Sequence, residues 1–411
     1  MRTTQRTLIA LAATGLLGLS VAGCDDYLTV DNPNIVDAST IDPLAEASSL
    51  ALSVEQEFAD NYAELAAYSA WFTGSLYNSD INPGGNLLAS RNLEETSGPV
   101  EGLYTGLSRT RALAGLVFET VEGTPVEVSE SAARATLFSG FAFLFFAEFY
   151  CQATVDGGPA MGTTTLLDSA TVHLGNARTL AQQVGHSDFE NAAKVGLARA
   201  YLQMGDAPQA IQVAESVDPA FTYDMRYSDD LANRDRVGNY LYYSQASQTT
   251  ISVAPAYRSL GDPRVVTHGP ENHNFVAMDG ETPIWSMEKY NSYSAPIRLA
   301  SSLEAEYILA EANGTAAMLA LAQERRAAAG LEPYSGATDP PSVLEEFLEQ
   351  KTRDFFVEGK RMGDYRRHPD GLRTLIPAGT EYHKTGLPAY GDQQCWPIPE
   401  EELSNNPNLE R

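Results

Sequence analysis

Apolar residues recur at helical spacing along much of the first third of the chain. The spacing predicts an amphipathic helix within residues 43–77 and a second one over 99–120. Residues 131–150 are apolar nearly all round, which is typical of a helix at the centre of a core. Between the first two helices, Asn-Ser-Asp-Ile-Asn-Pro-Gly-Gly over 78–85 is a strong loop signal. The apolar positions that define the first helix include Leu44, Leu52, Phe58, Tyr62 and Leu65.

Residues 188–217 carry the clearest local pattern, two helices joined by Gly205-Asp206. This pattern resembles a tetratricopeptide unit, although Lys194 stands where that repeat usually has Trp. A second helix–turn–helix is predicted over 297–329. The positions that fall at the repeat's spacing are Leu197, Ala198, Tyr201, Gly205 and Ala210.

The interval 218–296 is irregular and mixes Pro, Gly, Asn and Tyr with short β-like runs. An interval this long inside a globular chain is usually an insertion that carries function. A further helix is predicted over 343–362, and the chain after Arg373 is irregular and Pro-rich.

The N-terminus has the pattern of an export signal. Arg2 and Arg6 precede an apolar run, Leu8–Leu19, that is too short to span a bilayer comfortably. Val21-Ala22-Gly23-Cys24 then resembles the lipobox of bacterial lipoproteins, which predicts cleavage before Cys24 and lipidation of its thiol. The alternative is an ordinary secretory signal. The most apolar later run, 137–150, contains Glu148 and is short enough to favour a buried helix.

Charge narrows the set of partners. The 54 Asp and Glu residues outnumber the 27 Lys and Arg residues, which opposes broad binding to nucleic acid or anionic lipid. No Cys–His cluster has zinc-ligand spacing, and none of the six His residues stands in an H-E-x-x-H pattern. No nucleophile elbow or P-loop is present. The sequence therefore predicts neither a metal nor a cofactor, although two carboxylates of a glycosidase would leave no motif.

Two cysteines remain once Cys24 is assigned to the anchor. Cys151 and Cys395 form an even pair in an oxidising compartment, which predicts a disulfide. Two separate buried thiols are the alternative.

Four features in this order resemble the SusD/RagB family of outer-membrane nutrient-uptake lipoproteins. They are the lipobox leading into Cys24–Leu28, the helix Ala132–Tyr150 followed by Gly157-Gly-Pro159, the acidic-aromatic box Leu348–Arg361 with Asp364 and Arg366, and the closing Trp396-Pro-Ile-Pro399 with Glu402 and Asn406–Leu409. The segment Ile297–Leu331 also fits. Gln350-Lys351 replaces the family's Glu-Arg, and the chain stops at Arg411 just after its closing element.

The resemblance implies a mainly α fold, a tetratricopeptide-like scaffold with a loop-rich insertion. Its expected parts are a signal peptide over 1–23, a tether over 24–42, an N-terminal scaffold over 43–217, a ligand-binding insertion over 218–296 and a C-terminal part over 297–411. The implied function is binding of an oligosaccharide or peptide and its delivery to a SusC-like TonB-dependent barrel. The protein would be a non-enzymatic binder, lipid-anchored in the outer membrane and facing the cell surface. The alternatives are an envelope glycoside hydrolase and a tetratricopeptide-type assembly lipoprotein.

Aromatic side chains near loops are the candidate ligand contacts, because sugar rings pack on Trp and Tyr while Asn, Asp and Arg satisfy their hydroxyls. Packing between helices is the alternative for each aromatic residue. The charged set Glu358, Arg361 and Asp364 and the plug Trp396 are interpreted as structural. The candidate ligand-binding residues are Trp71, Tyr77, Asn78, Asp80, Trp285, Tyr290, Asn291 and Tyr293.

Overall fold

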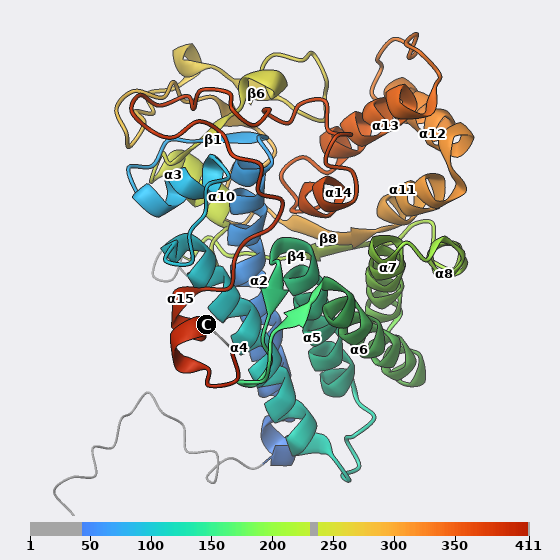
Figure 1. The fold of residues 1–411 in the computed structure, drawn as a ribbon. Coiled ribbons are helices and arrows are strands. Elements are labelled where there is room, and N and C mark those ends of the chain that lie inside the picture. Colours follow the sequence, from blue (N-terminus) through green and yellow to red (C-terminus); the bar gives the residue numbers. More distant parts are fainter. Residues whose placement is uncertain (1–42, 231–236, 410–411) are drawn as a thin grey trace, which may run out of the picture. The chain divides into compact units, whose positions relative to one another are not determined.

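The computed structural model describes residues 43–230 and 237–409, so the predicted signal peptide, Cys24 and the tether lie outside the described residues. The chain divides into Met1–Glu46 and one compact unit, Ala47–Arg411. The structure is mainly helical (Figure 1). The helices are α2 Pro43–Phe72, α3 Pro83–Ala89, α4 Gly98–Val121, α5 Glu130–Phe149, α6 Thr163–Val184, α7 Ser187–Met204, α8 Ala207–Ala214, α10 Tyr240–Ala246, α11 Ser302–Asn313, α12 Thr315–Ala328, α13 Pro340–Asp354, α14 Arg361–Arg367 and α15 Glu400–Asn405.

The strands are short, and in the described residues each pairs with one partner. The four antiparallel pairs are β1–β5, β2–β3, β4–β8 and β6–β7. Two of these pairs, β1–β5 and β4–β8, tie the irregular interval to the helical scaffold on either side of it. The strands are β1 Leu76–Asn78, β2 Gln152–Ala153, β3 Met161–Gly162, β4 Thr222–Met225, β5 Ile251–Val253, β6 Thr267–His268, β7 Ser286–Met287 and β8 Ile297–Ser301.

Helix α5 is the centre of the core, as its apolar sequence predicts. By length and composition alone it is able to cross a membrane, yet its most apolar window is 94% buried inside the fold. Helices α4, α6 and α7 pack around it. Phe58 of α2 contributes a ring 5.1 Å from Phe138 and another contact, at 5.5 Å, to Phe145. Burial on all sides explains why α5 shows no polar stripe.

The predicted tetratricopeptide-like pair is confirmed as α7 and α8. Gly205 ends α7 in the left-handed conformation, with φ 76°, and Asp206 caps α8 by accepting from the backbone N–H of Gln209. Figure 1 shows α6, α7, α8, α11, α12 and α13 stacked on one side of the unit. The second predicted pair begins later than expected, because residues 297–301 form β8 against β4 before α11 starts.

Two other predicted helices end early at residues with positive φ. The first stops at Phe72, before Gly74 at φ 75°. The helix predicted over 343–362 is divided into α13 and α14, because Val357 and Gly359 adopt φ of 56° and 72°. Such values interrupt a right-handed helix.

The charged set of this box is structural but does not form one cluster. Glu358 is buried and pairs with Lys289 at 2.6 Å and with Arg298 at 3.0 Å. Asp364 pairs instead with Lys351 at 2.6 Å and with Arg367 at 2.7 Å. Arg361 donates to the Thr73 carbonyl, at 3.2 Å, and to the hydroxyls of Thr352 and Thr374. Glu358 and Arg361 thus join the C-terminal part to Lys289 and Thr73, whereas Asp364 pairs within the C-terminal part.

The segment after α14 is fixed to the core at one point by a disulfide. Cys151 and Cys395 are bonded, with Cα atoms 5.1 Å apart, which confirms that prediction. Trp396 beside it is fully buried against Phe149 and Tyr150, as expected for a plug. Figure 1 shows this segment, in red, running past α3 and β1 before it reaches α15.

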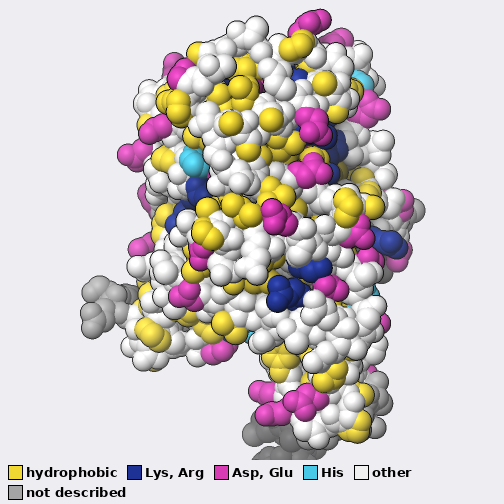
Figure 2. Space-filling model, turned by 90° about the vertical axis from the view of Figure 1, so that its right-hand side faces the viewer, with side chains coloured by type: hydrophobic (Ala, Val, Ile, Leu, Met, Phe, Trp, Pro, Cys, Tyr) yellow, Lys and Arg dark blue, Asp and Glu magenta, His cyan; other side chains and the backbone are white. Residues whose placement is uncertain are grey.

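Acidic residues outnumber basic ones over the chain. On the face drawn in Figure 2 the acidic side chains are scattered among hydrophobic and uncharged ones, and the Lys and Arg side chains gather at a few places.

Candidate functional site

Backbone pairing brings two of the predicted aromatic residues together. Tyr77 of β1 lies opposite Ser252 of β5. The backbone N–H of Trp285 donates to the Ser252 hydroxyl at 2.9 Å, and the Trp285 carbonyl accepts from the Val253 N–H at 2.8 Å. One short strand, β5, therefore positions residues that are 208 positions apart in the sequence.

Arg258 lies between these two rings. Its Nε donates to the Val253 carbonyl at 2.8 Å, and its guanidinium carbon is 5.7 Å from the Tyr77 ring centre and 5.3 Å from that of Trp285. Burial lowers the pKa of Arg258, with Tyr77 opposing the shift, but an arginine remains charged at neutral pH. A guanidinium held over aromatic faces fixes the rings and keeps donors available.

His383, which lies in the irregular segment after α14, adds a third ring to this group. Its ring stacks on Tyr77, with centres 4.1 Å apart and planes 10° apart, and its Nε2–H donates to the Asn78 carbonyl at 2.9 Å. Burial, opposed by that hydrogen bond, lowers the pKa of His383 to about 4. The imidazole is therefore neutral at physiological pH. We call His383, Tyr77, Arg258 and Trp285 the aromatic platform; all four are partly exposed.

Lys384, next to His383 in the sequence, binds the loop between β1 and α3. Its ammonium group donates to the carbonyl of Asp80, to Oδ1 of Asn86 at 3.0 Å and to Oδ2 of Asp279 at 3.1 Å, and its side chain is 4% exposed. Three segments of the chain thus meet at one buried cation. A lysine ammonium group has three N–H donors, and here they bind oxygens of all three segments, which holds these segments together.

The other predicted residues of this region have structural roles. Trp71 is 2% exposed and stacks on Tyr68 at 4.9 Å, so the packing alternative describes it. Asn78 is fully buried; its Nδ2 donates to Asn86 and its Oδ1 accepts from the Asp80 N–H. The Asp80 carboxylate accepts from the Asn82 N–H at 3.1 Å. These side chains shape the loop between β1 and α3.

The structure does not bring the predicted residues of 285–293 into one surface. Tyr290 is 1% exposed and donates its hydroxyl to the Val357 carbonyl at 3.0 Å, so the expectation that its ring faces a ligand is wrong. Tyr293 packs edge-on against Tyr242 of α10. Asn291 is exposed but lines a different hollow, beside Lys289 and Arg298. Sequence proximity misled here because this segment turns its side chains in different directions.

Sequence reasoning missed two members of the platform, Arg258 and His383. Neither lies near a predicted site residue in the sequence, and His383 is 306 positions from Tyr77. The one sequence feature that could have indicated His383 is its position between Tyr382 and Lys384, with Tyr390 seven residues later.

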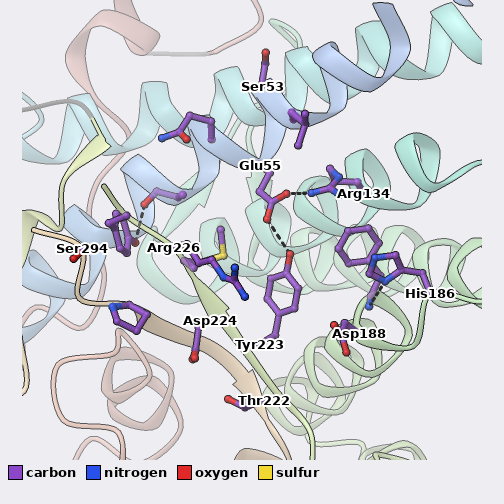
Figure 3. A pocket seen from close by; sticks show the side chains of 17 residues that line it. Ser53, Glu55, Arg134, His186, Asp188, Thr222, Tyr223, Asp224, Arg226 and Ser294 are labelled. Atoms are coloured by element: carbon purple, nitrogen blue, oxygen red, sulfur yellow. Dashed lines mark hydrogen bonds and ion pairs between the residues drawn. The ribbon is translucent and has the colours of Figure 1, made fainter. Parts of the chain in front are cut away.

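A separate hollow, the polar cavity, lies between α2, the start of α7 and β4. Its volume is about 970 Å³. Figure 3 shows Glu55 from α2 and Arg134 from α5 forming an ion pair at its wall, with the Tyr223 hydroxyl reaching Glu55. Asp224, Arg226 and Ser53 line it as well. Among the described residues no group of three or more His, Cys, Asp and Glu is placed to hold a metal ion.

Comparison with known proteins identifies the fold. The sequence matches no protein-family model and no curated protein. A SusD superfamily protein from Parabacteroides distasonis superposes with a TM-score of 0.66 over 89% of this chain and 98% of its own, at 14% identity. The chain has the SusD-like fold.

Other SusD-like structures agree over the same extent. A SusD superfamily protein from Bacteroides vulgatus gives a TM-score of 0.65 at 15% identity, covering 88% of this chain and 98% of its own. A laminarin-binding SusD-like protein gives 0.64 at 14% identity, covering 89% and 98%. The fold class expected from the sequence is therefore confirmed.

Proposed function

We propose that this protein binds an oligosaccharide on the aromatic platform as a non-enzymatic, lipid-anchored receptor of the outer membrane. The observation that carries the proposal is the row His383–Tyr77–Arg258–Trp285. His383 covers one face of Tyr77, so a sugar would meet the exposed part of this row and the Trp285 ring, where its C–H groups pack on apolar surface and the guanidinium group adds donors for hydroxyls.

The fold supports a ligand of this class. The SusD-like structures that superpose on the chain include one described as laminarin binding and another, from Bacteroides vulgatus, described as a putative sugar binding protein. A peptide is the second ligand class: Arg258 offers a partner for a C-terminal carboxylate, but the four members include no carboxylate to pair with an N-terminal ammonium group.

Delivery to a TonB-dependent barrel completes the proposal. The lipobox-like Val21–Cys24 supports an anchor, and the order of motifs along the chain supports a partner of the SusC type at the cell surface. In this account the receptor binds without a cofactor, and the barrel supplies transport.

A titration panel tests the binding step. Neutral laminari- and malto-oligosaccharides and uncharged peptides are titrated into wild type and into Tyr77→Ala/Trp285→Ala. We expect a glycan to bind, each lost ring to weaken it by about 1–3 kcal/mol, and added salt to change the affinity little. Tyr334→Ala, a partly exposed tyrosine in the loop after α12, is the control that leaves binding intact. Tight binding by the platform variant would exclude the platform as the site.

A further inference from the structure

We propose that the polar cavity is a second oligosaccharide site that binds the same chain beyond the platform. The inference rests on the proposed function, because it concerns the same ligand. The cavity is distinct from the platform: its lining comes from α2, α5, α7, β4 and the residues just before β8, and it shares no residue with the platform (Figure 3).

One wall of the cavity is already organised by internal bonds. The Glu55 carboxylate accepts the Tyr223 hydroxyl at 2.9 Å and pairs with Arg134. Arg134 also pairs with Glu130, at 2.7 Å. Burial, reinforced by Glu55, raises the pKa of Tyr223, so its hydroxyl keeps its proton. These groups need no ligand, and their fixed geometry leaves the Tyr223 ring in place at the cavity.

Phe189, the other ring of this wall, is not available for stacking. It is 2% exposed, with His186 stacked on it at 3.7 Å and the Arg134 guanidinium 4.9 Å from its centre. Tyr223, which is partly exposed, is the ring that a sugar would meet. The cavity therefore offers a ligand chiefly hydrogen-bonding groups, whereas the platform offers chiefly apolar ring surface.

The solvent-exposed polar side chains of the cavity lie in β4, just after it, and on α2. Asp224 and Arg226 are both exposed, and within residues 43–230 and 237–409 Arg226 forms no ion pair. Thr222 and Ser53 are exposed beside them. The lining holds three carboxylates, of Glu55, Asp188 and Asp224, and two guanidinium groups, of Arg134 and Arg226.

Nearly balanced charge with donors and acceptors intermixed suits a neutral ligand whose hydroxyl groups both donate and accept. An anion would meet the carboxylates, and a cation would meet the guanidinium groups.

An extended peptide is the less suitable occupant. In the described residues β4 pairs only with β8, so one of its edges has no partner strand. The register shifts between Tyr223 and Asp224, however, and charged side chains flank the shift. Bulges and charges are the devices that keep a further strand from pairing with an edge.

The chain itself links the two sites. Residues 285–296 lead from Trp285 of the platform to Ser294 and Pro296 at the cavity. The nine residues from Trp285 to Ser294 span at most about 30 Å even when extended. A sufficiently long oligosaccharide would contact both sites and gain affinity by effective concentration.

Chain length tests the inference. Laminari-oligosaccharides from trisaccharide upward are titrated into wild type and into Ser53→Trp, which fills the cavity from an exposed position of α2. In wild type we expect the affinity to rise with length by on the order of 10²-fold. In Ser53→Trp the rise should be lost, while the trisaccharide, which reaches only the platform, binds as in wild type.

A second cavity variant tests the same site without adding a bulky side chain. Asp224→Asn/Arg226→Gln leaves net charge unchanged and should weaken the longest chain by about tenfold. Glu57→Gln/Arg109→Gln, which removes an ion pair outside both sites, is the matched control. An equal length dependence in wild type and both cavity variants would overturn the second site alone. Failure of every oligosaccharide to bind wild type would overturn the proposed function and this inference with it.

Discussion

Replacing Lys384 by Met should loosen the loop between β1 and α3 and destabilise the protein. The Lys384 ammonium is the shared partner of the Asp80 carbonyl, the Asn86 amide oxygen and the Asp279 carboxylate. Methionine fills similar volume without a donor, so all three oxygens lose a bond at a site that water reaches poorly.

The size of this loss of stability depends on the hydrogen bonds that Asp279 keeps. Removing one member of a buried ion pair usually costs about 3–5 kcal/mol because the other charge is left without its partner. Asp279 keeps hydrogen bonds from the Thr282 hydroxyl at 2.6 Å and from the backbone N–H groups of Glu281 and Thr282. We therefore expect a loss near the lower end, about 3 kcal/mol of unfolding free energy.

Chemical denaturation of a double-mutant cycle measures this loss. Asp279→Asn in the Lys384→Met background should recover part of the stability, since the unpaired charge is removed, giving a coupling of about 1–3 kcal/mol. Lys194→Met, which breaks an i,i+4 pair with Glu190, is the control and should cost under about 1 kcal/mol. A Lys384→Met protein as stable as that control, or a cycle without coupling, would refute the reasoning.

The pH dependence of stability in the same variants provides a further test. Burial opposes ionisation of Asp279, but its hydrogen bonds with Thr282, Glu281 and Lys384 outweigh burial and lower its pKa. A lowered folded pKa contributes stability at neutral pH that is lost as pH falls through that pKa. The loss on acidification should therefore be smaller in Lys384→Met than in wild type.

The remaining predictions concern the disulfide, one buried acid and the anchor. The Cys151→Ser/Cys395→Ser variant should lose about 2–5 kcal/mol, because the bond closes a loop across 244 positions; an unchanged melting temperature would contradict this. Burial, followed by the charge of Asp60, raises the pKa of Glu64 to about 7, so wild-type stability should fall as pH rises from about 4.5 to about 7. Glu64→Gln should flatten that fall, which amounts to at most about 3 kcal/mol, and an identical pH profile would disprove the assignment. Cys24→Ser should move the protein from the membrane fraction to the soluble envelope, and unchanged partitioning would exclude lipidation there.

Periodicity predicted the helices whose burial is local and continuous. The all-round apolar run of α5 and the Gly205-Asp206 turn between α7 and α8 depend only on residues that are neighbours in the sequence, and both predictions are confirmed. Helix α6 was missed although Leu166, Ala170, Leu174, Ala177 and Ala181 repeat at helical spacing and are buried. The apolar spacing of this helix is therefore present in the sequence.

The site was predictable only in part, since it is assembled from distant segments. Tyr77 and Trp285 stood out as aromatics near loops, and they do meet through β5. Nothing local predicts that Arg258 enters between them or that His383 stacks on Tyr77. Tyr290 failed as a candidate because its polar neighbours suggested exposure, while tertiary packing buries it against Val357.

The emission of Trp285 tests the central claim most directly. The protein has three tryptophans, and Trp71 and Trp396 are 2% and 0% exposed, so an added quencher such as acrylamide reports chiefly on partly exposed Trp285. If a laminari-oligosaccharide covers the platform, saturating ligand should protect the emission from acrylamide, and Trp285→Phe should abolish the protection while still binding sugar. Full binding with no change in quenching of the wild-type protein would contradict the platform as the glycan site.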